Sequence, residues 1–75
     1  MDKKIFLIDK DFYTEEMVAK LTEKDLEEWV AEEDYTGDCT IVKIDANRYN
    51  TAKDAIKNEF PFCNLSDFYV FTFGF

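Results

Sequence analysis

The chain has 75 residues, of which 47% are hydrophobic and 17% aromatic, and its formal net charge is −8. This length allows one small domain, residues 1–75, and the apolar content is too high for a disordered chain. The negative charge excludes unaided binding to nucleic-acid phosphates or to an anionic membrane, because both require lysine and arginine side chains.

The first half of the chain predicts a strand followed by two helices. Residues 3–9 form an apolar run without alternation, which is typical of a strand buried on both faces. Thr14 and Thr22 are suitable N-cap residues, and Asp25 follows Thr22 at the spacing of a capping box. We therefore expect two short helices, at 14–21 and 22–33, with one continuous helix as the alternative, and then a turn at 34–38.

The second half predicts a strand, a helix and a last strand. Residues 39–45 form an alternating strand that suits the edge of a sheet. Apolar residues then recur at helical spacing from Tyr49 to Phe60, with Asn47 or Asn50 as the N-cap and Pro61 as the stop. Residues 67–75 complete the order as a strand that is apolar on both faces.

These elements predict a small α/β, or α+β-like, fold with the order β-α-α-β-α-β. Each connection between strands carries a helix, which is typical of crossovers between parallel strands. We therefore expect a mostly parallel three-stranded sheet in the order 2-1-3, with helices on both faces. A sheet covered on one face, or a mixed sheet, is the alternative.

The negative charge is concentrated in residues 14–38. This segment holds ten acidic residues and two lysines, so it accounts for the whole net charge of −8. Either it forms a solvated helix face, or it docks a basic protein partner, since the acids outnumber what helix capping requires. The expected partner-binding residues are Glu23, Glu27, Glu28, Glu32, Glu33 and Asp34.

We predict from this segment a non-enzymatic protein-interaction module that meets a basic protein surface. The alternative within the binding class is a nucleic-acid mimic that inhibits a DNA- or RNA-binding protein. A third possibility is a structural protein that forms a homodimer through the aromatic strand at residues 67–75.

The chemistry of the remaining residues offers little support for an enzyme. The chain has no histidine, so Cys39 and Cys63 lack the usual partner for zinc binding or nucleophilic catalysis. We expect two reduced and largely buried thiols, no cofactor and no enzymatic activity. The first apolar run, IFLI, is too short for a signal peptide or a membrane span, so we expect a cytoplasmic protein.

One motif supports a different function. The segment IFLIDKDFYT, an apolar strand ending in Asp-x-Asp, resembles the first motif of haloacid-dehalogenase-type phosphotransferases. The resemblance implies that Asp9 is a nucleophile, that Asp11 is a general acid, and that a magnesium ion binds between carboxylate and phosphate. The segment departs from the motif at Tyr13. The family's domain, which is built on a doubly wound sheet, is also more than twice as long as this chain. Magnesium-dependent phosphate chemistry is therefore kept as an alternative, with Asp9 and Asp11 as weak metal candidates.

Overall fold

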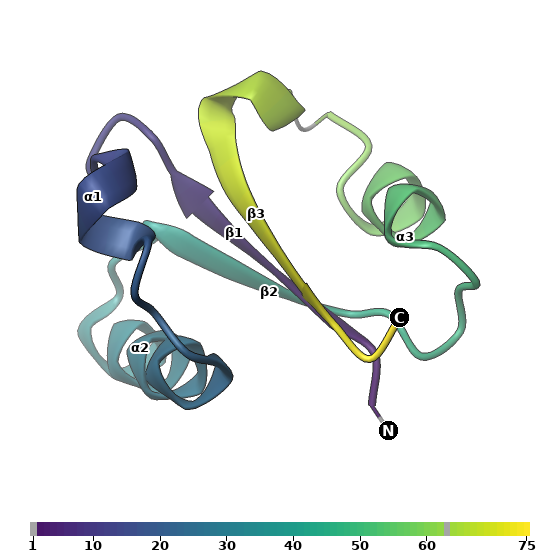
Figure 1. The fold of residues 1–75 in the computed structure, drawn as a ribbon, viewed down its shortest axis with the longest axis horizontal. Coiled ribbons are helices and arrows are strands. Elements are labelled where there is room, and N and C mark those ends of the chain that lie inside the picture. Colours follow the sequence, from purple (N-terminus) through teal and green to yellow (C-terminus); the bar gives the residue numbers. More distant parts are fainter. Residues whose placement is uncertain (1, 63) are drawn as a thin grey trace.

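The chain folds around a three-stranded sheet with helices on both faces (Figure 1). The computed structural model describes residues 2–62 and 64–75. Its elements are β1 (Lys4–Asp9), α1 (Glu15–Val18), α2 (Glu23–Thr36), β2 (Ile41–Asp45), α3 (Ala52–Glu59), the short 3-10 helix η1 (Leu65–Asp67) and β3 (Phe68–Phe73). This order agrees with the sequence prediction, apart from η1, which precedes the last strand.

The sheet is antiparallel throughout, so the prediction of a mostly parallel sheet is wrong. The strand order is β2-β1-β3, as expected, but β1 pairs antiparallel with both neighbours. Ile8 near the end of β1 lies opposite Ile41 at the start of β2 and Tyr69 near the start of β3. The molecule is therefore a small α+β fold.

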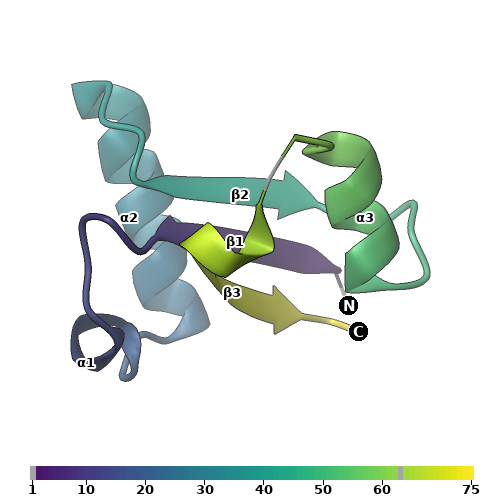
Figure 2. The same cartoon turned by 90° about the horizontal axis from the view of Figure 1, so that it is seen from above.

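The path of the first connection explains the error. The backbone N–H of Asp9, at the end of β1, donates to the carbonyl of Thr40, just before β2, at 3.0 Å. The connection between these strands, which contains α1 and α2, therefore begins and ends at the same end of the sheet. Figure 2 shows α2 running across the strands, so it does not return the chain to the start of β1.

The second connection does cross the sheet. Because β2 and β3 both run opposite to β1, they run in the same direction as each other. The segment containing α3 therefore carries the chain from one end of the sheet to the other. The crossover prediction holds for this connection and fails for the first.

The central strand is buried on both faces. Ile5 and Leu7 pack beneath α3, while Phe6 and Ile8 pack beneath α1 and α2 (Figure 1). The buried residues on the α3 side are Ile5, Leu7, Ile44, Ala46, Ala55 and Ile56. Those on the other side are Phe6, Ile8, Val18, Leu26 and Ile41. The continuous apolar run of β1 therefore reflects two covered faces, not parallel pairing.

The first two helices begin where their capping residues predict. Thr14 Oγ1 accepts a hydrogen bond from the backbone N–H of Met17, and Thr22 Oγ1 accepts one from Asp25. The Asp25 carboxylate accepts in return from the N–H of Thr22 at 3.0 Å, which completes the capping box. The prediction of two helices is confirmed.

Two local predictions need correction. The N-cap of α3 is Thr51 rather than Asn47 or Asn50, and its hydroxyl accepts from the N–H of Asp54 at 3.1 Å. Residues 34–36, predicted as a turn, continue α2 until Gly37 ends it with φ of 83° and an N–H bond to the carbonyl of Glu33. A glycine can adopt this left-handed conformation without the steric cost of a side chain.

The two cysteines have different outcomes. Cys39 is exposed, so the prediction of a buried thiol is wrong for this residue, and Cys63 lies outside the described residues.

In the described part of the chain, no helix combines the length and the apolar character that crossing a membrane requires.

Candidate functional site

The fold divides the six predicted partner-binding acids into three groups. Glu23 and Glu27 turn toward the sheet and pair with lysines of the strands. Lys4 Nζ lies 2.8 Å from Glu23 Oε1 and 3.0 Å from Glu27 Oε1, and Lys43 Nζ lies 2.8 Å from Glu27 Oε1. These carboxylates therefore join α2 to β1 and β2, and much of their charge is neutralised within the molecule.

The pKa values reflect this pairing. Hydrogen bonds from Lys43 and then Lys4 lower the pKa of Glu27 below its ordinary value of 4.5. Hydrogen bonds to Glu23 and Glu27 raise the pKa of Lys4 above its ordinary value of 10.5. Lys4 and Glu27 each favour the charged form of the other, so this pair stays charged around neutral pH.

Glu33 forms the second group and faces inward. Only 7% of its surface is exposed, and its Oε1 accepts hydrogen bonds from the backbone N–H and the hydroxyl of Thr40, both at 2.6 Å. The Thr40 hydroxyl is also 3.2 Å from the Tyr13 hydroxyl. Because Thr40 gives its one hydroxyl proton to the carboxylate, Tyr13 is the donor in the bond to Thr40. Glu33 therefore joins the end of α2 to the chain entering β2.

The remaining three acids are exposed but do not share one face. Glu28 and Glu32 are one helical turn apart on the side of α2 that faces solvent, whereas Asp34 lies on a flank beside Cys39 and Lys43. Asp25 and Tyr35 follow the same helical spacing as Glu28 and Glu32, and Tyr35 is 93% exposed. We call Asp25, Glu28, Glu32 and Tyr35 the outer stripe of α2.

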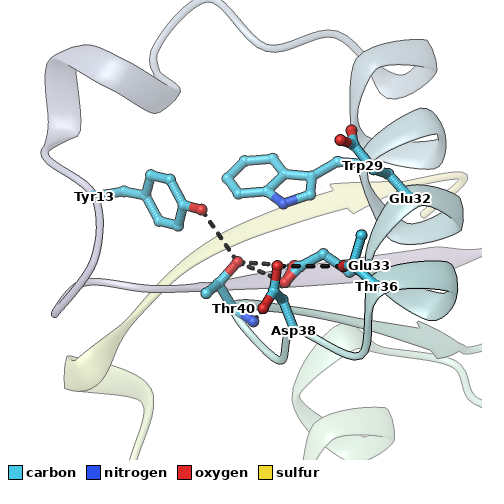
Figure 3. Close-up of a pocket in the computed structure, with 7 residues that line it drawn as sticks. All are labelled: Tyr13, Trp29, Glu32, Glu33, Thr36, Asp38 and Thr40. Atoms are coloured by element: carbon cyan, nitrogen blue, oxygen red, sulfur yellow. Dashed lines mark hydrogen bonds between the residues drawn. The ribbon is translucent and has the colours of Figure 1, made fainter.

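A pocket of about 370 Å³ lies beside this stripe (Figure 3). It is lined by Tyr13, Trp29, Glu32, Glu33, Thr36, Asp38 and Thr40. The acidic run of the sequence predicts Glu32 and Glu33 as binding residues, but it does not indicate the two aromatic residues. Tyr13 and Trp29 lie 16 residues apart and meet only through the turn of the chain after β1, so no local pattern identifies the pair.

Asp9 and Asp11 form a turn at the end of β1. Asp9 Oδ1 accepts a hydrogen bond from the backbone N–H of Asp11 at 2.8 Å. Among residues 2–62 and 64–75, no group of three or more acidic or cysteine residues is arranged to hold a metal ion. The antiparallel sheet also differs from the doubly wound sheet that the phosphotransferase resemblance implies.

The outer edge of β3 is a further exposed feature. β3 is the last strand of the sheet, and its sequence, FYVFTF, contains no charged residue. Val70 is 43% exposed and Leu65, beside the start of the strand, is 42% exposed. Edge strands are commonly protected from pairing by charged side chains, and β3 has none of its own.

Comparison with known proteins adds no functional assignment. No protein-family model, curated protein or solved structure matches this chain. Its class is therefore defined by the fold itself, an antiparallel sheet of three strands between helical layers, and its function is argued from the surfaces described above.

Proposed function

We propose that this protein is a non-enzymatic interaction module that docks a basic protein partner through the outer stripe of α2. The observation that carries the proposal is the division of the acids. Glu23, Glu27 and Glu33 have partners inside the molecule, whereas the described residues form no salt bridge with Glu28 or Glu32. These two carboxylates remain available to another molecule.

The charge of the whole chain supports the same partner. A net charge of −8 speeds the approach of a basic surface, and it opposes binding to anionic partners. Tyr35 adds an aromatic side chain of the kind that is enriched at the centres of protein interfaces. The proposed location of this interaction is the cytoplasm.

A pull-down with charge-reversed variants tests the proposal. Glu28→Lys changes the outer stripe, while Asp67→Lys makes the same change in charge on η1, on the opposite side of the sheet (Figure 2). We expect wild type and Asp67→Lys to retain the same partner at low salt and to release it at high salt, and Glu28→Lys to retain much less. Equal retention of the partner by the two variants, or retention that does not depend on ionic strength, would contradict the proposal.

Adding DNA to the captured complex separates ordinary docking from nucleic-acid mimicry. Release of the partner by DNA would show that the stripe occupies a nucleic-acid site, as expected for a mimic. Retention in the presence of DNA supports docking outside such a site.

A second candidate, self-association through β3, is favoured by the uncharged edge and by the exposure of Val70. Two copies of β3 pairing antiparallel would form a symmetric six-stranded sheet. We expect sedimentation to show a dimer in the wild type and a monomer in Thr72→Lys, which places a charge on this strand. A wild-type monomer at high concentration would exclude the dimer.

A further inference from the structure

The pocket beside the outer stripe combines aromatic rings with unneutralised carboxylates. Three of its lining residues are acidic, Glu32, Glu33 and Asp38, and none is basic. Its volume of about 370 Å³ is at the lower end of the range for small-molecule sites. A cavity of this size and charge suits one cationic side chain and excludes an anion.

The aromatic wall of the pocket is preformed. The rings of Tyr13 and Trp29 meet edge to face, with centroids 4.7 Å apart and an interplanar angle of 76° (Figure 3). The Tyr69 hydroxyl donates to the backbone carbonyl of Tyr13 at 2.9 Å, and Tyr13 donates to Thr40, so the position of the Tyr13 ring is fixed at both ends. A ligand therefore meets rings that do not have to be ordered on binding.

A nearly buried carboxylate, that of Glu33, also lines the pocket. Glu33 is 7% exposed and accepts hydrogen bonds from neutral donors of Thr40, with no lysine or arginine bonded to it among the described residues. The nearby Asp38 carboxylate accepts from the hydroxyl of Thr36 at 3.2 Å, which is also a neutral donor. A cation entering the pocket would gain from both charges, because neither is cancelled within the site.

We propose that this pocket binds an arginine side chain of the basic partner, an inference that rests on the proposed function and assigns its anchor residue. Guanidinium fits better than ammonium because it is planar, stacks on aromatic rings and donates several hydrogen bonds to carboxylates in a fixed geometry. Glu32 connects the two sites, since it belongs both to the outer stripe and to the pocket lining.

Fluorescence of Trp29, the one tryptophan of the chain, reports on the pocket directly. The probe is N-acetyl-arginine N-methylamide, and its neutral control is the matching citrulline compound at equal ionic strength. We expect a saturable change in emission with the arginine probe in the millimolar range, and binding at least about fivefold weaker for citrulline, since a single charge-assisted hydrogen bond has that effect. Equal responses to both probes, or no saturation at tens of millimolar, would overturn the proposal.

Variants locate the binding site. The Glu32→Gln/Asp38→Asn double variant removes two carboxylates of the pocket and should weaken arginine binding at least about fivefold. Asp67→Asn removes a carboxylate on η1, outside both the pocket and the outer stripe, and should leave the affinity unchanged. Unaltered affinity in the double variant, with the fold verified by amide spectra, would contradict the assignment.

The two proposals can fail separately. If the arginine probe does not bind but Glu28→Lys still loses the partner in the pull-down, the docking stripe stands and the anchor pocket is wrong. If the probe binds and Glu28→Lys retains the partner fully, the pocket stands and the docking proposal is wrong.

Discussion

Glu33 shows that residues of one chemical type within one segment can have opposite roles. It follows Glu32 directly, yet the fold buries Glu33 against Thr40 and leaves Glu32 at the surface. The sequence places both in one acidic run, because the difference depends on which side of α2 meets the chain entering β2. Composition predicted the acidic segment but not its inward-facing member.

Glu33→Ala should therefore destabilise the protein. It leaves the backbone N–H and the hydroxyl of Thr40 without their acceptor, at a cost of roughly 1 to 3 kcal/mol in the free energy of unfolding. Glu28→Ala, on the exposed side of the same helix, should change stability by less than about 0.5 kcal/mol. Urea unfolding measures both, and equal stability of the two variants would show that the buried carboxylate has no structural role.

The two glycines allow a matched comparison at the same scale. Both have positive φ, 83° at Gly37 and 85° at Gly74, so alanine is strained at either position. A Cβ at Gly37 has no atom within 4 Å, whereas one at Gly74 would clash with the backbone carbonyl oxygen of Asp2. We expect Gly37→Ala to cost about 1 kcal/mol and Gly74→Ala clearly more. Thermal unfolding of the two variants checks this order. Gly74→Ala should unfold at the lower temperature, and the reverse result would contradict the expectation.

Among the elements, the start of α2 was predicted closely, because the signals that define it are local. Thr22 and Asp25 are three residues apart in sequence and bond to each other in the structure. The end of α2 was predicted less well, since residues 34–36 suit either a turn or a helix and Gly37 alone determines the stop. Pairing of its inner acids with Lys4 and Lys43 depends on distant strands and could not be predicted from the helix.

The ion pairs of α2 predict a pH dependence. The folded-state pKa of Glu27 is lowered, so its contribution to stability is complete above the ordinary value of 4.5 and is lost as the pH falls through the folded pKa. Stability should therefore fall below pH 4.5, and less steeply in Glu27→Gln, which does not titrate. Denaturant unfolding across this range measures both slopes, and parallel curves would show that Glu27 makes no such contribution.

The contribution of Lys4 to stability depends on pH in the opposite direction. Its pKa is raised, so its contribution is complete below the ordinary value of 10.5 and is lost as the pH rises through the folded pKa. Between these limits both ions are charged, and the attachment of α2 to the sheet is insensitive to pH.

At the scale of the whole molecule, the order of the strands was predictable and their direction was not. The apolar run in β1 correctly indicated a central strand with both faces covered. Direction depends on how a connection crosses the sheet, and α2 lies across the strands instead of along them (Figure 2). Nothing in its periodicity specifies that orientation, since an amphipathic helix can bury the same stripe at several angles.

The candidate sites follow the same division. The acidic surface was visible in the sequence because charge is a property of composition, but its exposed part is smaller than the six residues suggested. The pocket of Tyr13 and Trp29 could not be found without the fold. The absence of enzymatic activity and the docking of a basic protein partner remain predictions.

The most direct test of the docking proposal is a map of backbone amide shifts on titration with a hexa-arginine peptide. We expect the largest shifts in α2, Glu23–Thr36, and their loss at ~0.5 M salt, where screening acts within about 4 Å. Shifts centred on α3 or β3, shifts spread evenly over the chain, or none at all would contradict the claim that the outer stripe of α2 receives a basic partner.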